Sequence, residues 1–484
     1  MRRSMFFRVF RLALPCLWIA LSGTAFAESE LGLDEYLAQV GRGNLGMRGA
    51  AEISAGAFAR SVEKDVLLAP TLFANARHAS DASEGSNQFY LSEKVNATSY
   101  SAGIQQLTSF GLSGRLYYQI DHNDILNPRS PLVSAAPGFT SSFYDSKPVI
   151  ELNLNLWRNR LGRETRATQT LIESGALVTG YGESFRIKMT KAQAEAIYWR
   201  LSLARETVAV QKDSVARAKK IRDWNDRRLR LQLADRADLL QAEALLQARA
   251  LELQAAIDEE AAASRAFNTG RGVDSDRVSE KLIKVDTIAM DRITIPARAP
   301  MREDVKAAEA AQKAAVASTV IGREKNRPTF DLFGSVALNG RDPRMSQSVS
   351  QSFKTENPTY AAGVKLTMPL DFGALSDVRE GYGRESDGAV LNFERRLFEQ
   401  ERDWADLSTK FNDAKRRLQL ALGMEAVQKE KYDHERDRLT RGRTVTFQVL
   451  QFEQDYRNSQ LARIRSQAEL LTLLANMKTY GDAK

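Results

Sequence analysis

The strongest constraint on the fold of this 484-residue chain is an internal repeat that contains very long helical segments. Residues 302–372 predict a helix, a strand led by a proline, and an alternating strand closed by a glycine, after which a long helix follows. A looser copy of this order begins near residue 34. The matching positions are Pro70-Thr71-Leu72-Phe73 with Pro328-Thr329-Phe330-Asp331, and Gly162 with Gly373. Repetition on this scale indicates an architecture built from two copies of one unit.

The first 27 residues predict a secretory signal peptide. Four arginines precede an apolar run at 12–21, and Ala25-Phe26-Ala27 offers a small-residue cleavage site. A permanent N-terminal membrane helix is the less favoured alternative, because this run is about half of the ~20 residues that a span needs. Cys16, the single cysteine, lies inside the signal. The mature chain from Glu28 therefore has neither disulfides nor a thiol nucleophile.

Charge argues against a nucleic-acid partner. The formal net charge is +8, and removal of the signal takes away four arginines and no acid, which leaves +4. Nucleic-acid binding would require a stronger basic imbalance with a matching motif. After residue 27 no apolar run reaches the length of a membrane helix. A membrane span would then have to use β-strands, which need only ~9–11 residues each.

Strands of strict alternation are predicted within residues of about 70–157 and about 328–371. In the last of them, apolar side chains occupy the even positions from Tyr360 to Leu370, and mostly small or polar side chains occupy the odd positions. This period of two gives each strand one apolar and one polar face. A soluble sheet with one wet face would show the same pattern.

The predicted loops favour a membrane barrel. Long polar loops are expected at 79–98, 122–146 and 340–357, and a short turn at 108–111. Long loops on one side and short turns on the other are typical of outer-membrane barrels. Segments 99–107 and 112–121 predict an added hairpin, which would give four strands in the first copy and two in the second. Six strands cannot enclose a pore, so the barrel is expected to be shared between protomers.

Two very long helical hairpins follow the strands, at 163–268 and 374–478. They are interrupted mainly by a polar spot at 232–235 and a turn at 441–443, and arms of roughly 70 residues would be on the order of 100 Å long. Apolar residues recur at sevens, which is coiled-coil spacing. These residues are Leu201, Val208 and Val215, and then Leu239, Leu246 and Leu253. Taken alone, the helices would also fit a soluble coiled-coil protein.

Nothing in the sequence predicts a reaction. No pair among His78, His122 and His434 has the spacing of metal ligands. No G-x-S-x-G motif and no arrangement of Ser, His and Asp indicates a nucleophile. We therefore expect no enzyme activity, no metal and no cofactor.

Four motifs, in order, carry a resemblance to the TolC-like outer-membrane efflux protein family. They are Arg302-Glu303-Asp304-Val305-Lys306-Ala307-Ala308-Glu309, then Arg327-Pro328-Thr329-Phe330-Asp331-Leu332-Phe333-Gly334, then Gly363-Val364-Lys365-Leu366-Thr367-Met368-Pro369-Leu370-Asp371-Phe372-Gly373, and, more loosely, Leu154-Asn155-Leu156-Trp157-Arg158-Asn159-Arg160-Leu161-Gly162-Arg163. With the duplicated hairpins, the resemblance covers nearly all of the mature length.

The resemblance implies an α+β membrane protein in the cell outer membrane that extends into the periplasm. A homotrimer would share one transmembrane β-barrel, continuous with a long periplasmic α-helical barrel. Its function would be the exit duct of a tripartite efflux pump or of type I secretion. Its partners would be a periplasmic adaptor (membrane fusion) protein, an inner-membrane transporter of the proton-driven or ABC type, and outer-membrane lipid. Drugs, metal ions and polypeptides all leave through such ducts, so the cargo stays open.

The expected organisation has five parts. A signal peptide (1–27) precedes the first repeat (28–268), a linker or equatorial segment (269–301), the second repeat (302–478) and a tail (479–484). The alternative is a soluble periplasmic coiled-coil adaptor or scaffold protein. Such a protein should show one hairpin flanked by compact β-domains, whereas this chain alternates two hairpins with strands.

The resemblance also places a pore constriction at the hairpin tips. Gln448 and Gln451 occupy the positions of the family's acidic ring, and Asp238 matches its acidic residue after the first turn. Amides in place of carboxylates predict a weaker cation preference, because rings of charged side chains set pore selectivity. Nearby Arg227, Arg228, Arg230 and Arg236 could favour anions, or could simply face solvent or the adaptor.

Four tip residues are candidates for adaptor contact, again by resemblance. They are Leu231, Leu233, Gly442 and Val445. Exposed apolar positions at a helical end suit docking of a partner helix into a groove. Ordinary packing of a hairpin turn would use the same residue types. Gln232 stands where the family has the glycine of the first turn.

Overall fold

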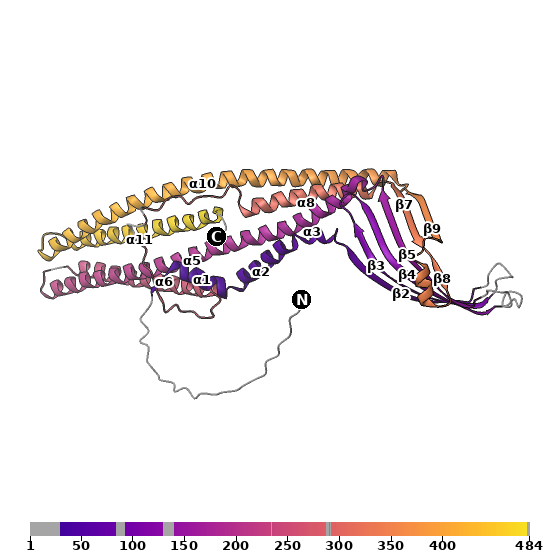
Figure 1. The fold of residues 1–484 in the computed structure, drawn as a ribbon. Coiled ribbons are helices and arrows are strands. Elements are labelled where there is room, and N and C mark those ends of the chain that lie inside the picture. The colour runs from indigo at the N-terminus through magenta and orange to yellow at the C-terminus, as the bar shows by residue number, and fades with distance from the viewer. Residues whose placement is uncertain are drawn as a thin grey trace, which may run out of the picture.

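The computed structural model describes residues 30–83, 92–128, 140–233, 235–286, 290 and 292–481. The predicted signal peptide (1–27), Ala234 at the first tip and the last three residues lie outside this part of the chain. Figure 1 shows an elongated molecule with a β-sheet at one end and two helical hairpins at the other. This shape separates a strand region from a rod region.

One antiparallel sheet contains the long strands of both repeats. The first repeat supplies β2 (Thr71–Asp81), β3 (Ser92–Leu107), β4 (Leu112–Pro128) and β5 (Ser142–Asn155), and the second supplies β7 (Thr329–Leu338) and β9 (Pro358–Thr367). The order across the sheet is β2-β3-β4-β5-β7-β9. The two repeats join where Leu154 of β5 lies opposite Leu332 of β7. The expected hairpin is therefore present as β3 and β4.

The predicted loops are shorter in the structure than the sequence suggested. β2 and β3 continue to Asp81 and from Ser92, and β4 and β5 continue to Pro128 and from Ser142. Ladder hydrogen bonds come from the backbone, so polar residues extend these strands when their side chains find partners. His122 stacks on Tyr144 with ring centroids 4.3 Å apart. The expected loop at 340–357 contains β8 (Gly340–Asp342), which pairs with β5, and α9 (Met345–Gln351).

Two helices run nearly the whole length of the rod. They are α5 (Arg163–Arg230) and α10 (Phe372–Thr440), of 68 and 69 residues, or on the order of 100 Å each. The returning helices α6 (Arg236–Gly270) and α11 (Thr446–Met477) are half as long, so the expectation of roughly 70 residues holds for only one arm of each hairpin.

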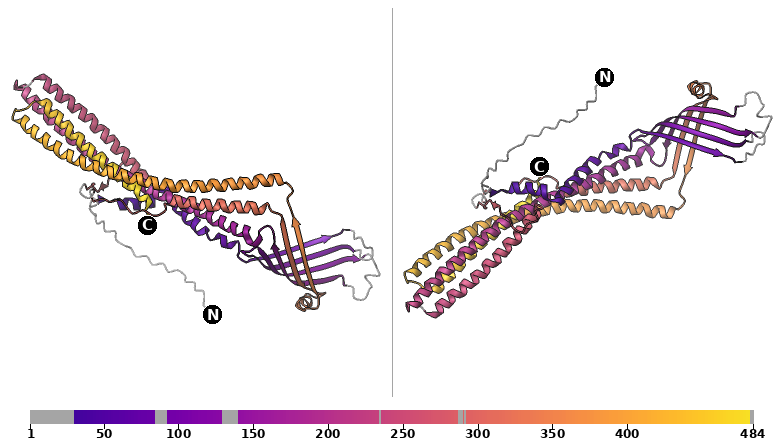
Figure 2. Two further views of the ribbon diagram at one scale, coloured as in Figure 1. Left: turned by 90° about the horizontal axis from the view of Figure 1, so that it is seen from above. Right: turned by 90° about the horizontal axis from the view of Figure 1, so that it is seen from below.

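Shorter helices cover the half of the rod next to the sheet. α2 (Leu45–Arg60) and α3 (Glu63–Val66) pack on α5, and α8 (Glu303–Lys325) packs on both α5 and α10. Figure 2 shows this arrangement from above and below, with the paired helices continuing into the sheet. Each half of the rod is thus four helices in cross-section.

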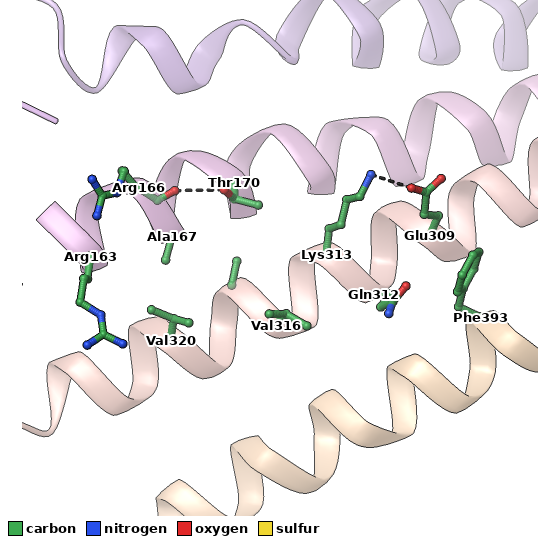
Figure 3. Close-up of a pocket in the computed structure, with 11 residues that line it drawn as sticks. Arg163, Arg166, Ala167, Thr170, Glu309, Gln312, Lys313, Val316, Val320 and Phe393 are labelled. Carbon is green, nitrogen blue, oxygen red and sulfur yellow. Dashed lines mark hydrogen bonds and ion pairs between the residues drawn. The ribbon is translucent and has the colours of Figure 1, made fainter.

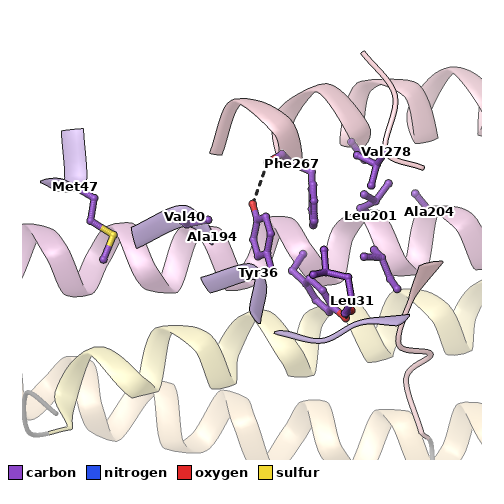
Figure 4. Close-up of a cluster of buried hydrophobic side chains, with 12 residues drawn as sticks. Leu31, Tyr36, Val40, Met47, Ala194, Leu201, Ala204, Phe267 and Val278 are labelled. Carbon is purple, nitrogen blue, oxygen red and sulfur yellow. Dashed lines mark hydrogen bonds between the residues drawn. The ribbon is translucent and has the colours of Figure 1, made fainter. Parts of the chain in front are cut away.

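An aromatic core joins the chain at the middle of the rod (Figure 4). Tyr36 of α1 (Leu33–Gly43) stacks on Phe267 with ring centroids 4.0 Å apart, and its hydroxyl donates to the Phe267 carbonyl at 3.2 Å. Burial raises the pKa of the Tyr36 hydroxyl. Beside it, β1 (Glu30–Leu31) pairs with β6 (Lys281–Leu282), so the segment between the repeats is fixed to the start of the described chain.

The predicted coiled-coil seam is partly displaced. Leu201 and Val208 of α5 are buried as expected, but Leu239, Leu246 and Leu253 are half-buried. Val215 of α5 is half-buried as well. The buried positions of α6 at intervals of seven are instead Ala242, Arg249, Ala256 and Ala263, and Ser264, Phe267 and Asn268 near its end are also buried. Small alanines allow the helices to approach closely, and the leucines flank that seam. The period was right and its register was wrong.

Candidate functional site

One face of the sheet is a continuous apolar band. Side chains at even positions of all six long strands share this face, because each register pairs even positions with even positions. Leu72 on β2 is 78% exposed, and Tyr360 on β9 is 71% exposed. The other large members of the band are Tyr100, Ile104, Leu116, Ile150, Leu152, Leu332, Val336, Val364 and Leu366. An exposed apolar surface of this extent marks an interface with a protein or a membrane.

The apolar stretches have the length of a membrane span. Alternating apolar residues and glycines fill residues 112–120 of β4, 148–156 in and after β5, 330–338 of β7 and 360–368 in and after β9. Each stretch is nine residues long. A tilted strand needs about 9–11 residues to cross the hydrocarbon core of a bilayer. On these four strands the band therefore fits lipid in thickness as well as in polarity, whereas the apolar even positions of β2 and β3 are limited to Leu72–Ala76 and Tyr100–Ile104.

The opposite face of the sheet is polar and carries both signs of charge. Arg115 pairs with Glu151 at 3.4 Å, and the Tyr117 hydroxyl donates to the same carboxylate at 2.8 Å. Lys147 pairs with Asp121 at 3.4 Å. Because the charges pair with one another across neighbouring strands, this face offers water a polar wall without a dominant sign of charge.

At the other end of the molecule, both helical hairpins turn with the same backbone geometry. Gln232 has φ 59° and Gly442 has φ 69°, so each turn has one left-handed residue. The next N–H in each turn, of Leu233 or of Arg443, bonds to a carbonyl five residues earlier, at 2.8 Å and 2.9 Å. This is the Schellman ending of a helix, which favours glycine at the left-handed position. The first tip places a glutamine there.

The predicted constriction residues lie near the tips. Gln448 and Gln451 are exposed on α11, and Asp238 is half-exposed in the first turn of α6. The sequence reasoning missed Asp455, which lies one turn after Gln451 on the same helix face. Gln451 Nε2 donates to the Asp455 carboxylate at 3.3 Å, and Lys431 pairs with it at 3.5 Å. The spacing 448, 451, 455 follows one helix face and could have identified Asp455.

The predicted contact residues are exposed at the extreme end of the rod. Leu231, Leu233 and Val445 are each more than 60% exposed, and a side chain added at Gly442 would meet open space. Two of the nearby arginines have partners within the chain. Arg230 pairs with Asp226, and Arg228 stacks on Trp224. The tips therefore present apolar side chains beside arginines, of which Arg230 is paired with a carboxylate.

A buried ionic network joins the two hairpins above the tips. Glu453 of α11 is fully buried, and its carboxylate accepts from Ser214 at 2.7 Å and from Arg217 at 3.2 Å, both on α5. Arg249 of α6, 3% exposed, donates to the same carboxylate at 3.1 Å. Arg457 and Arg249 both pair with Glu252. These contacts connect α5, α6 and α11 through one carboxylate.

A second aromatic pair lies beside this network. The rings of Tyr432 on α10 and Tyr456 on α11 stack with centroids 6.0 Å apart, and the Arg217 guanidinium lies over Tyr456 at 5.3 Å. Burial raises the pKa of Tyr432 to about 12. The network thus includes all four helices of this half of the rod.

A groove of about 540 Å³ opens between α5, α8 and α10 near the sheet (Figure 3). Its apolar wall contains Val316, Val320 and Phe393. Its charged residues pair locally, as Lys313 does with Glu309 at 2.7 Å. Nothing in this lining pairs a nucleophile with a base.

Two features are absent from the described residues. No group of three or more His, Cys, Asp or Glu side chains within them could hold a metal ion. No helix in the same residues is long and apolar enough to cross a membrane.

Comparison with solved structures identifies the fold. No family model matches the chain, and no curated protein matches its sequence. The chain superimposes on the outer membrane protein VceC of Vibrio cholerae with a TM-score of 0.63 and 14% identity, over 93% of this chain and 96% of that one. The outer-membrane channel OprN gives 0.62 and 16%, over 93% and 89%.

A third structure, the CmeC outer membrane channel of Campylobacter jejuni, gives a TM-score of 0.61 and 16% identity, over 93% of this chain and 85% of that one. The chain thus has the fold of these outer-membrane channel proteins, which confirms the combination of helices and strands that the resemblance implied for a single chain.

Proposed function

We propose that this chain is a channel of the cell outer membrane, an exit duct that conducts solutes passively from a periplasmic machine to the exterior. The observation that carries the proposal is the exposed apolar band, whose nine-residue stretches suit a bilayer. The polar face of the same sheet would line the lumen. The helical hairpins would extend the duct on the order of 100 Å into the periplasm. No step of this function requires catalysis or a cofactor.

We propose a homotrimer, as the resemblance implies. Both long sides of the molecule carry exposed apolar side chains that a neighbouring copy would cover. On the α10 side these are Leu391, Phe398 and Leu420, and on the opposite side Leu45, Ile53 and Leu251 of α2 and α6. Because the two sides differ, the contact is head-to-tail, which closes into a ring.

The apolar tips would dock a periplasmic adaptor, which in turn would connect the duct to an inner-membrane transporter. Leu231, Leu233, Gly442 and Val445 are the proposed contact residues. Replacement of Leu231 and Val445 by serine should abolish adaptor cross-linking in cells and leave the amount of assembled duct unchanged. The matched control is serine at Val62, an exposed apolar residue between α2 and α3 and far from the tip, which should leave adaptor cross-linking intact. Equal loss in both variants would contradict the assignment.

The resemblance supports two kinds of transport machine, a tripartite efflux pump and a type I secretion system. Deletion of the gene separates them by its phenotype. Raised sensitivity to drugs or metal ions would support efflux, and a missing secreted polypeptide would support secretion.

Channel formation itself is tested in planar lipid bilayers. The processed chain, purified in detergent, should insert and give discrete conductance steps. The alternative of a soluble periplasmic adaptor predicts no insertion and a chain that stays in solution without detergent. That result would overturn the proposal.

A further inference from the structure

Each copy contributes six long strands to the sheet, and this number determines the width of the proposed barrel. We infer that β9 of one copy pairs with β2 of the next, and that three copies of six strands close into an 18-stranded barrel with a wide, water-filled lumen. The inference rests on the proposed trimeric duct. It specifies which edges meet, in which register, and what size of cargo the membrane part admits.

The directions of the edge strands permit this closure. Every adjacent pair of long strands in the sheet is antiparallel. In an antiparallel sheet of six strands the first and last run in opposite directions, so β2 and β9 of adjacent copies would also be antiparallel. Figures 1 and 2 show β2 (indigo) and β9 (orange) on opposite sides of the sheet. Pairing of these edges would leave no strand edge exposed to lipid, which a membrane sheet requires.

The internal repeat supplies the register. Inside one copy, β5 leads to a long helix and pairs with β7, which follows Pro328. At the seam between copies, β9 also leads to a long helix, and β2 follows Pro70. Leu154-Asn155-Leu156 aligns with Leu366-Thr367-Met368 when the connection to Gly373 is one residue shorter than the connection to Gly162, and Pro328 aligns with Pro70. The observed pair Leu154 and Leu332 then corresponds to Leu366 facing Ala74 of the next copy. In the same register Lys365 faces Asn75, and Val364 faces Ala76.

Side-chain size on the outer face fits the same pairing. β2 presents the small residues Ala74 and Ala76 beside a hollow of about 410 Å³, whose lining includes Tyr100 and Tyr118. β9 presents Val364 and Leu366, each more than 60% exposed. Large side chains opposite small ones fill such a seam. Parity also agrees, because this register places even positions of both strands on the apolar face.

The strand number has a consequence for cargo. With a strand spacing of about 4.8 Å and a tilt of about 40°, 18 strands give a backbone diameter of about 36 Å, whereas 12 strands would give about 24 Å. Barrels of 16–18 strands leave an aqueous channel. Folded into the lumen, the polar face carries paired charges of both signs. The membrane part would therefore admit small solutes and extended polypeptides alike, and selection would fall to the helical tips.

Cysteine cross-linking tests the seam in the full-length chain, whose mature part contains no cysteine. The variant Asn75→Cys with Lys365→Cys places two thiols opposite each other on the water-filled side. The control, Asp81→Cys with Lys365→Cys, keeps the same strands and face and displaces one thiol by six residues, or about 20 Å. Oxidation should link copies into dimers and trimers at least about ten-fold more in the first variant than in the control, and reductant should reverse it.

Equal cross-linking in both variants, or none in either from preparations that conduct in bilayers, would overturn the inference while the duct proposal stands. Preparations that neither conduct nor assemble would contradict the duct proposal itself. Single-particle images of the assembled protein give an independent count. A wall of 18 strands about 36 Å across supports the inference, and a wall of 12 strands contradicts it.

Discussion

The two predicted repeats (28–268 and 302–478) each supply long strands and a helical hairpin, and they differ at both ends. In the sheet, the first repeat has four long strands and the second has two, because the hairpin β3–β4 lies between β2 and β5. At the tips, the same turn contains Gln232 in the first repeat and Gly442 in the second. The hairpin β3–β4 widens the sheet and keeps every pairing of its long strands antiparallel. Both tips have the same turn geometry and backbone hydrogen bonds, although only the second has glycine at the left-handed position.

The largest effect is expected where the two hairpins meet. Glu453→Ala would remove the buried carboxylate that pairs with Arg249, which is buried, and with Arg217, which is partly buried. Loss of one partner from a buried ion pair costs about 3–5 kcal/mol. Thermal unfolding of the assembled protein, followed by circular dichroism, should show a much lower midpoint. The control Glu469→Ala lies on the same helix as Glu453 and removes an exposed partner of Arg417 on α10. It should cost less than about 1 kcal/mol. Similar midpoints for both variants would mean that the network does not hold the hairpins together.

The tip turns allow a reciprocal exchange. Gly442→Gln should destabilise the second turn, and Gln232→Gly should stabilise the first, because a left-handed conformation costs a side chain about 1–2 kcal/mol. The same thermal midpoints measure both variants. Destabilisation by both would show that Gln232 makes a compensating contact and that the turns are not equivalent.

Ion selectivity tests whether Gln448 and Gln451 of the second hairpin lie at the constriction. Gln448→Asp with Gln451→Asp would add two carboxylates per copy to the face that contains Asp455, and should shift the reversal potential in a KCl gradient toward cations. The control Gln454→Asp adds a carboxylate about 100° around the helix from Asp455, and should change the potential little. Strong cation selectivity of the unmodified channel, unchanged in the double variant, would contradict the assignment of these glutamines to the constriction.

The smallest effect concerns the segment between the repeats. The hydrogen bond from Arg271 lowers the pKa of the Glu280 carboxyl. A lowered pKa in the folded state means that this contribution is complete above the unfolded value, about 4.3, and is lost as pH falls through the folded value. Glu280→Gln should cost about 1 kcal/mol at pH 7 and make stability less dependent on pH below about 4. Identical acid unfolding curves for both proteins would contradict this.

Local patterns in the sequence predicted much of this fold. Alternation located the strands, because one face of each is apolar, and Arg441-Gly442-Arg443 located the second tip. The alternation did not predict the polar ends of β4 and β5. His122 and Tyr144 extend these strands through contact with each other. Strand length there depends on a partner strand, which no single segment encodes.

The buried network was beyond such patterns. Glu453, Arg249 and Arg457 are charged residues on helices, and by composition alone they would be placed on solvent-exposed faces. Their burial depends on three helices meeting at one point, which no local pattern in the sequence encodes. Asp455 lies outside the two positions that match the family's acidic ring, and only its spacing from Gln448 and Gln451 places it on their helix face.

We propose that several identical copies together form one wall that is compatible with lipid. The mass of the assembly formed by the processed polypeptide tests this directly. Light scattering coupled to size exclusion, corrected for bound detergent, should give three times the mass of one chain, and removal of detergent should cause aggregation. A monodisperse, water-soluble monomer without detergent would contradict the shared wall.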